Sequence, residues 1–450
     1  MHMARSIMAA AVPAAVLVAL AATPVVATAA PKARGRYEVF MNEPWPIGCP
    51  GNLKRPQVGL PDWTSFGILA NPGNAFSGPV VATIYKCGTF PHFTGMAPGN
   101  WNASNATAVY GGLPQLMDLE QHLAQVKTDI TALIPDPDSA GVANIDWEAW
   151  KPNFKDNSWN EYWIYINRSI ALVQQQHPSW LPEKQVAQAE MDFNLASQAL
   201  WNSTIQLCQK LRPKTLWGWY NFPGEASSSP KRPEVDDSMM WLYENVDALF
   251  PSIYLESANA SVNRQRVDNQ MIEARRVRDA VTASTGKKPK IYTFTWMDYY
   301  THEVYPYTVF LDEADVETSF GRPQSRWGAD GSVWWGTSED DTNETLCGSG
   351  PGSKSHYTKT VLGPLVKKAS EQAELCATQL CSSHGTCWLP PPPPAEQQQA
   401  AAGTRAVGGD HNHHNGGAEA EVGAPPPLPL KLACDCDLGF TGTDCSTKRH

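Results

Sequence analysis

The sequence of 450 residues predicts a TIM-like (β/α) barrel followed by a small cysteine-rich module. Eight short apolar, β-branched or aromatic runs recur through the first three quarters of the chain, and amphipathic helical patterns separate many of them. Beyond about residue 365 the composition changes, and this tail holds six of the ten cysteines. An open, doubly wound sheet is the structural alternative that the same alternation of strands and helices permits.

The eight strand candidates have the short length that is typical of buried parallel strands. They are residues 39–43 (VFMNE), 66–70 (FGILA), 80–85 (VVATIY), 142–148 (VANIDWE), 216–222 (LWGWYNF), 248–254 (ALFPSIY), 290–296 (KIYTFTW) and 331–336 (GSVWWG). Three stretches show apolar residues at three- and four-residue spacing, which predicts helices: 113–134, 161–176 and 186–211. We therefore assign residues 36–365 to the barrel and 366–450 to the module.

The N-terminal 30 residues have the layout of a secretory signal peptide. Arg5 precedes the apolar run MAAAVPAAVLVALAA, and the small residues ATAA end at Ala30, near which we expect cleavage. No later run approaches the roughly 18 apolar residues of a membrane-spanning helix. N-glycosylation sequons suit an exported glycoprotein and occur at Asn102, Asn105, Asn167, Asn202, Asn259 and Asn343. We expect the protein to be secreted or to reach the lysosome through the secretory pathway.

The C-terminal tail matches an EGF-like module. Its last cysteines lie in CDCDLGFTGTDC, which fits the pattern C-x-C-x2-G-[FY]-x-G-x2-C that closes such modules. The usual EGF-like pairing implies three bridges, whereas spacing alone allows fifteen connectivities. The implied bridges are Cys376–Cys387, Cys381–Cys434 and Cys436–Cys445. A Pro-, Gly- and His-rich insertion at about 389–430 is predicted to be a disordered loop inside the module, its histidines polar filler and not metal ligands.

Two acids stand at the end of the fourth strand candidate. In an extended chain Asp146 and Glu148 lie on the same face, and like charges in a partly dry site raise the pKa of one of them. A carboxylic acid that stays protonated near neutral pH can act as a general acid. Alternatively, the two acids are solvated at a strand end or cap the next helix. The net charge of −10 argues against a nucleic-acid partner.

Aromatic residues stand at the ends of three other strand candidates: Tyr220, Tyr254 and Trp335. Catalytic groups of a (β/α) barrel gather at the carboxyl ends of its strands, so these rings are expected beside the two acids. Aromatic faces stack on sugar rings while carboxylic acids act on the glycosidic oxygen. Each aromatic residue could instead pack a strand end, but together with the acids they favour a glycosidase.

The chain resembles the hyaluronidase family of glycoside hydrolases from about Phe40 to Cys445. The similarity rests on NIDWEAWKP, RPKTLWGWYNFP, LFPSIY, SVWWGT, and LGPLV leading into CATQLCSSHGTC. The resemblance implies a distorted (β/α) barrel that cleaves β-1,4 linkages after N-acetylhexosamine in hyaluronan, with chondroitin as a weaker substrate.

The resemblance also implies a role for each candidate residue. Glu148 falls on the general acid/base and Asp146 on the acid that holds the substrate acetamido group, while Tyr220, Tyr254 and Trp335 match residues of the substrate site. The implied mechanism is retaining and substrate-assisted, and it requires no metal or organic cofactor. Cys49 and Cys347 match a disulfide that joins the two ends of the barrel.

The sequence departs from the family in several places. A cysteine that is usual after the YxFP turn is absent from GEASSSPKRP, and Lys151 stands where arginine is common. Cys87 and Cys208 match no family cysteine, so they pair with each other or one is a free thiol. Two other functions are considered. A chitinase-like hydrolase is disfavoured because Asn144 replaces an acid of the chitinase pattern. The other alternative is a non-catalytic glycan-binding or adhesion protein.

Overall fold

The computed structural model describes residues 36–43, 63–95, 106–159, 162–224, 232–299, 309–336, 346, 350–390 and 432–449. Several predicted features lie outside these residues: the signal peptide, Cys49 and Cys347, the sequons at Asn102, Asn105 and Asn343, and residues 391–430 of the insertion.

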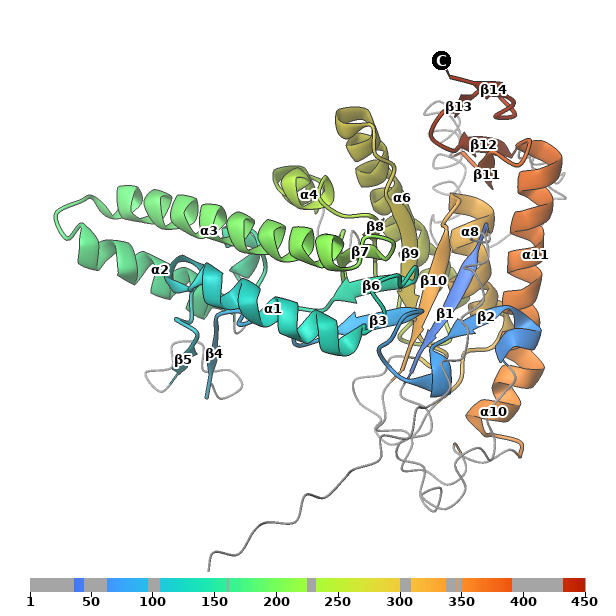
Figure 1. The fold of residues 1–450 in the computed structure, drawn as a ribbon, viewed down its shortest axis with the longest axis horizontal. Helices are drawn as coiled ribbons and strands as arrows, with labels where there is room; N and C mark the ends of the chain where they lie inside the picture. The colour runs from blue at the N-terminus through green and yellow to red at the C-terminus, as the bar shows by residue number, and fades with distance from the viewer. Residues whose placement is uncertain are drawn as a thin grey trace, which may run out of the picture. The chain divides into compact units, whose positions relative to one another are not determined.

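Eight parallel strands form a TIM-like barrel (Figure 1). They are β1 (Glu38–Asn42), β2 (Ile68–Ala70), β3 (Val81–Ile84), β6 (Val142–Ile145), β7 (Leu216–Trp219), β8 (Ala248–Leu249), β9 (Lys290–Thr295) and β10 (Gly331–Trp335). Each falls within or overlaps one of the eight predicted runs, which confirms that prediction. Backbone pairing joins β2–β1–β10–β9–β8 and β3–β6–β7, and a bridge between Tyr220 and Phe250 carries the sheet from β7 to β8.

A side chain joins β2 to β3, where the structure gives no strand ladder. The Asn71 amide donates to the Val81 carbonyl (2.7 Å) and accepts from the main-chain N–H groups of Val80 (2.9 Å) and Val81 (3.2 Å). β1, the first strand, pairs with β10, the last of the eight, as the closing of a barrel requires, so the doubly wound alternative is wrong. β3 also lies beside β1, where the Thr83 hydroxyl donates to the Asn42 side chain, so the regular strand order is interrupted at this junction.

Alternate side chains of each strand face the interior or the surrounding helices, as the two-residue period of a strand requires. On β1, Phe40 belongs to the interior cluster, whereas Val39 and Met41 pack against the helical layer. Gly218 on β7 leaves room for the neighbouring strand, because a Cβ atom there would lie 2.1 Å from the Ala248 carbonyl oxygen. The interior cluster consists of Phe40, Val81, Val142, Ala248, Phe250, Tyr292, Phe294 and Val333.

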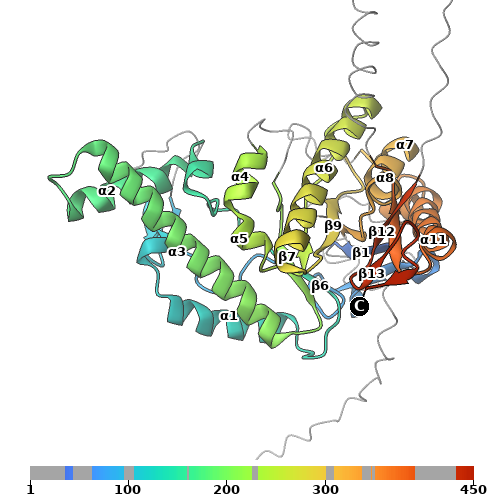
Figure 2. The same ribbon diagram turned by 90° about the horizontal axis from the view of Figure 1, so that it is seen from above.

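The three predicted helices are confirmed as α1 (Leu119–Leu133), α2 (Trp163–Gln176) and α3 (Pro182–Leu211). Asp118 caps α1 by accepting from Gln121 N–H at 3.0 Å, and Pro182 suits the first turn of α3. Figure 2 shows α3 beside both α1 and α2. The other α-helices are α4 (Arg232–Ser238), α5 (Met240–Tyr243), α6 (Ala260–Thr285), α7 (Glu313–Val316), α8 (Arg322–Trp327), α10 (Lys354–Tyr357) and α11 (Gly363–Leu380).

Shorter elements complete the barrel domain. β4 (His92–Thr94) and β5 (Thr107–Val109) form an antiparallel pair. The single helical turns are η2 (Trp63–Phe66), η3 (Pro72–Asn74), η4 (Pro114–Leu116), η5 (Phe154–Asn157) and the π-helical η8 (Glu317–Gly321) and η10 (Thr358–Leu362). Among the described helices, none combines the length and the apolar character needed to cross a bilayer.

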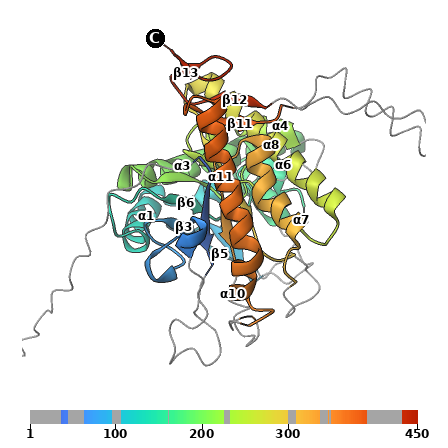
Figure 3. The same ribbon diagram turned by 90° about the vertical axis from the view of Figure 1, so that its right-hand side faces the viewer.

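The C-terminal module contains the three disulfides expected from the EGF-like pattern: Cys376–Cys387, Cys381–Cys434 and Cys436–Cys445. Its strands are β11 (Gly385–Trp388), β12 (Ala433–Cys436), β13 (Phe440–Thr441) and β14 (Thr447–Lys448). Helix α11 crosses the predicted domain boundary at residue 365 and carries Cys376, so it leads from the barrel directly into the module (Figure 3).

Ion pairs fasten the module to the barrel. Asp435 on β12 contacts Arg278 of α6 (2.5 Å) and Lys288 just before β9 (2.6 Å). Asp437 pairs with Arg36, just before β1, at 2.8 Å. Lys288 and Arg36 precede the amino ends of their strands, so the module lies at the face of the barrel opposite the carboxyl ends. We therefore expect the module to contribute stability and not substrate contacts.

We predict that acid weakens this attachment. Burial alone would raise the pKa of Asp435, but the positive charges of Arg278, Lys288 and Arg275 outweigh it and lower the pKa from 3.8 to about 2. Because the folded-state pKa is the lower one, the stabilisation is complete above about pH 4 and is lost as the pH falls towards 2. It amounts to about 2 kcal/mol. Urea unfolding at pH 5 and pH 2.5 should show this loss in the wild type, and an Asp435→Asn variant should lack that component.

Candidate active site

The two predicted acids follow β6 directly. The Asp146 N–H donates to the Ile84 carbonyl at 3.0 Å, which continues the pairing of β6 with β3 and fixes Asp146 at the carboxyl edge of the barrel. Asp146 is half-buried and Glu148 is exposed. Burial, and secondly the negative charge of Glu148, raise the pKa of Asp146, while Lys151 opposes the increase. Asp146 is thus the acid with the raised pKa that the sequence predicted, whereas the family resemblance implies that Glu148 is the proton donor.

Tyr220 and Tyr254 lie beside the acids at the ends of β7 and β8. Ser252 and Tyr254 lie near the Tyr220 hydroxyl, and the Tyr220 ring packs edge-on against Phe294 with a centroid distance of 4.9 Å. Burial and the charge of Glu148 raise the pKa of Tyr220, and burial and Tyr220 raise the pKa of Tyr254. Both phenols therefore remain protonated at neutral pH and can donate hydrogen bonds to a substrate.

Trp335, the last residue of β10, lies near the same tyrosines. Its ring centroid is 6.3 Å from that of Tyr254, and its indole N–H donates to the Tyr85 hydroxyl at 2.8 Å. The structure thus brings Asp146, Glu148, Tyr220, Tyr254 and Trp335 to one edge of the barrel, as their positions in the strand candidates predicted.

Tyr85 is a further candidate site residue, which the sequence reasoning missed. It directly follows β3, stacks on Phe76 with a centroid distance of 5.9 Å, and is 45% exposed. Burial and the charges of Asp146 and Glu148 raise the pKa of Tyr85, which places its hydroxyl in the electrostatic field of both acids. The signal was present, since Tyr85 ends the run VVATIY in the same way that Tyr254 ends ALFPSIY.

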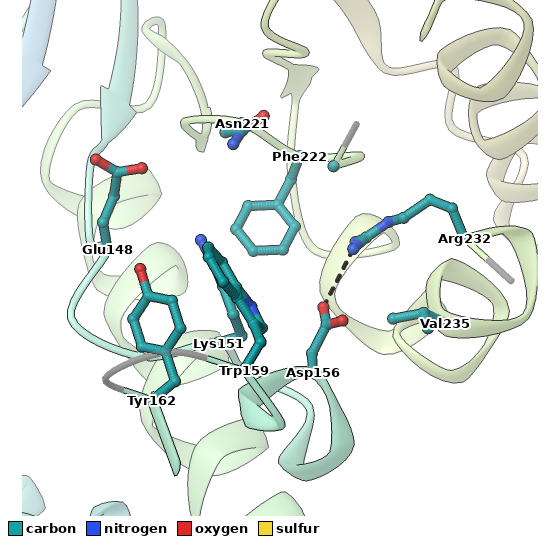
Figure 4. Close-up of a pocket in the computed structure, with 10 residues that line it drawn as sticks. Glu148, Lys151, Asp156, Trp159, Tyr162, Asn221, Phe222, Arg232 and Val235 are labelled. Carbon is teal, nitrogen blue, oxygen red and sulfur yellow. Dashed lines mark hydrogen bonds and ion pairs between the residues drawn. The ribbon is translucent and has the colours of Figure 1, made fainter. Parts of the chain in front are cut away.

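A cavity of about 550 Å³ opens beside Glu148. Figure 4 shows Glu148 at one end and Arg232 at the other, where Arg232 pairs with Asp156 at 3.1 Å. The Lys151 ammonium lies 5.6 Å from the centre of the Tyr162 ring, in the position where the family commonly has arginine. The cavity is further lined by Trp159, Asn221, Phe222, Gly224 and Val235. Aromatic faces, the Asn221 amide and the Lys151 ammonium next to a carboxylic acid suit the sugar rings of an acidic polysaccharide.

Three of the predicted sequons lie in the part of the chain that the structure describes. Asn167 on α2 and Asn259 before α6 are exposed, whereas Asn202 on α3 is half-buried. The Asn259 side-chain oxygen accepts from Val262 N–H at 3.3 Å and caps α6. Glycosylation at these positions remains a prediction.

Comparison with known proteins decides the family. A family model described as hyaluronidase matches residues 49–449, which is most of the chain. The chain belongs to the hyaluronidase family.

Several members of this family are similar to the chain over most of their length. Hyaluronidase-1 of Bos taurus is 34% identical over 371 residues, which are 78% of this chain and 77% of that protein. Chondroitin hydrolase of Caenorhabditis elegans is 30% identical and covers 74% of this chain and 73% of its own length. The crystal structure of bee venom hyaluronidase in complex with a hyaluronic acid tetramer is 28% identical, with a TM-score of 0.64, and covers 74% of this chain and 99% of the venom chain. The hyaluronidase fold and the glycoside hydrolase class therefore apply to this protein.

Proposed function

We propose that the protein is a secreted endo-glycosidase that hydrolyses the β-1,4 linkages after N-acetylhexosamine in hyaluronan. The observation that carries this proposal is the convergence of Asp146 and Glu148 with Tyr220, Tyr254 and Trp335 at the carboxyl edge of the barrel. The hyaluronic acid tetramer bound to the related venom enzyme supports the choice of polysaccharide. The signal-peptide pattern and the sequons support export.

In the first step, Glu148 protonates the glycosidic oxygen while the carbonyl oxygen of the substrate acetamido group attacks the anomeric carbon. The bond to the leaving sugar breaks and a cyclic oxazolinium forms. Asp146 accepts a hydrogen bond from the N–H of the substrate acetamido group, and Tyr254 donates a hydrogen bond to the same acetamido group. The raised pKa of Asp146 means that the acidic pair holds a proton at neutral pH. Positive charge develops on the substrate amide during the attack, and it favours the ionised form of Asp146. The proton that the two acids share therefore lies on Glu148, which donates it to the glycosidic oxygen.

In the second step, Glu148 takes a proton from water, and the resulting hydroxide opens the oxazolinium from the face that the leaving group vacated. The configuration at the anomeric carbon is therefore retained. The chain and the substrate supply both the proton donor and the nucleophile, so this route uses no metal or organic cofactor.

The mechanism predicts the first product. Newly released reducing ends should be in the β configuration, which proton NMR of an early digest can detect before mutarotation, and a thiazoline analogue of the oxazolinium should inhibit competitively. The α anomer appearing first would exclude retention. Absorbance from an unsaturated uronate would instead indicate a lyase.

A digestion panel tests the substrate. Hyaluronan, chondroitin, chondroitin sulfate and chitin are incubated with wild type and with Glu148→Gln, and reducing ends are measured. Rapid release from hyaluronan by the wild type alone supports the proposal. Chondroitin is the second candidate substrate because a relative is named chondroitin hydrolase. Release from chitin alone would favour a chitinase-like activity, and binding without release would favour a glycan-binding protein.

Tyr85 should contribute moderately to substrate use. Tyr85→Phe keeps the ring that stacks on Phe76 but removes the hydroxyl that accepts from Trp335. Losing one hydrogen bond of this kind costs about 1 kcal/mol, so kcat/KM for hyaluronan should fall by roughly 2- to 10-fold. Initial rates over a range of hyaluronan concentrations measure the effect. An unchanged kcat/KM would mean that the hydroxyl plays no part in the site.

A further inference from the structure

Two cysteines in the described part of the chain stand outside the three disulfides. Cys87 and Cys208 are both buried, with exposures of 3% and 0%, and both belong to the main hydrophobic core. Cys87 lies two residues after Tyr85 in the segment that leaves β3, and Cys208 lies in the last turn of α3. The other six described cysteines are all paired with one another.

The two thiols are close neighbours in the core, since Cys208 raises the pKa of the Cys87 thiol more than burial does. A side chain also connects the two backbone segments that carry the cysteines. His122 of α1 accepts from Thr89 N–H through Nδ1 at 3.0 Å, and its Nε2 lies 2.8 Å from the Thr204 hydroxyl. Thr89 is two residues from Cys87, and Thr204 is one helical turn before Cys208. One connection through His122 therefore holds the two segments side by side next to the cysteine pair.

The packing around this connection leaves little freedom to separate the segments. A Cβ atom at Gly88 would lie 2.5 Å from His122 Cε1, and Gly88 N–H donates to Asp129 at 2.8 Å. Burial lowers the pKa of His122 to about 4, so the imidazole stays neutral at physiological pH and its two hydrogen bonds persist. The two cysteines thus lie on the two segments that meet at this junction, one leaving β3 and the other in α3.

We propose that Cys87 and Cys208 form a disulfide bond in the exported protein. This inference rests on the proposed secretory route, because that compartment supplies the oxidant: a protein disulfide or oxidised glutathione. One thiolate attacks the oxidant disulfide and releases one of its thiols, and the second cysteine then resolves the mixed disulfide. The two cysteines lose two electrons and two protons, and the oxidant is reduced to two thiols.

We expect the bond to form during folding, because both cysteines are buried from an oxidant in the folded protein. Cys208 and burial raise the pKa of the Cys87 thiol, so the thiolate that attacks a disulfide is scarce in the folded protein. The bridge would close a loop of about 120 residues and tie α3 to the segment that follows Tyr85. It is a structural bond, since neither sulfur reaches the cavity beside Glu148.

Peptide mapping tests the pairing directly and needs no activity measurement, so its outcome is separate from that of the proposed glycosidase function. Protein secreted by a eukaryotic host is denatured, alkylated with iodoacetamide without reduction, digested and analysed by mass spectrometry. The expected result is a peptide pair linked through Cys87 and Cys208. Alkylation of both cysteines in most molecules would overturn the proposal, and so would a bridge from either one to Cys49 or Cys347.

A thermal double-mutant cycle gives a second measurement. If the disulfide exists, Cys87→Ala and Cys208→Ala should each lower Tm by about 5 °C or more, and the double variant should be little worse than either, because the first substitution already removes the bridge. Each single variant should also expose one thiol per chain to a thiol reagent in denaturant. Losses in Tm that add up in the double variant would contradict a bond between the two residues.

Discussion

Replacement of Glu148 by glutamine should lower the rate of hyaluronan hydrolysis by about 10²- to 10⁴-fold. Glutamine keeps the size of the side chain and its ability to hydrogen-bond, but it cannot give a proton to the glycosidic oxygen or take one from water. Since Glu148 is exposed at the edge of the cavity, the substitution leaves the core unchanged. Tm should therefore stay close to that of the wild type. Reducing-end release under saturating hyaluronan measures the loss of kcat.

Substrate binding should survive this substitution. Hyaluronan oligosaccharides should bind Glu148→Gln with a Kd, measured by titration calorimetry, within about 10-fold of the wild-type KM, because glutamine keeps the size and the hydrogen-bonding ability of the side chain. Glu183→Gln is a matched control, because Glu183 is an exposed glutamate in the first turn of α3 and should keep full activity. Turnover of Glu148→Gln close to that of the wild type would exclude the mechanism.

Local patterns predicted the strands well because each strand is short, apolar and buried on both sides. They placed the strand ends less well. The run 248–254 contains a strand of only two residues, Ala248–Leu249, since Pro251 has no N–H group with which to continue the ladder. The run 142–148 ends its strand at Ile145, although the Asp146 N–H still pairs with Ile84. The last residues of both runs thus belong to the active-site edge and not to the strands.

Contacts between distant residues could not be predicted from local patterns. The Asn71 side chain takes the place of strand pairing between β2 and β3, and nothing in FGILANPGN indicates this role. The attachment of the module joins Asp435 to Arg278, which no periodicity relates. Positions at the strand ends and the family resemblance together selected five candidate residues that the structure brings to one edge of the barrel, whereas Tyr85 was not selected because no motif of the resemblance included it.

A buried ion pair joins the two ends of the barrel. Lys354 of α10 donates to Glu43, the residue after β1, and their side chains are 0% and 1% exposed. Gly336 packs against the Glu43 carboxyl group and directly follows Trp335, so the pair also supports the active-site edge. The proposed Cys49–Cys347 bridge, whose residues lie outside those described, would connect the same two parts of the chain.

Lys354→Met should lower the free energy of unfolding by about 3–5 kcal/mol, because it removes the ammonium group that pairs with the buried Glu43 carboxylate. Urea unfolding followed by tryptophan fluorescence measures this loss. Adding Glu43→Gln should recover part of the stability, since the neutral amide costs less to bury than an unpaired carboxylate. Lys155→Met is the matched control: it breaks the Lys155–Glu190 pair, whose lysine is 74% exposed, and should cost less than about 1 kcal/mol. If the two lysine substitutions lowered the free energy of unfolding equally, burial would not explain the contribution of the Glu43–Lys354 pair to stability.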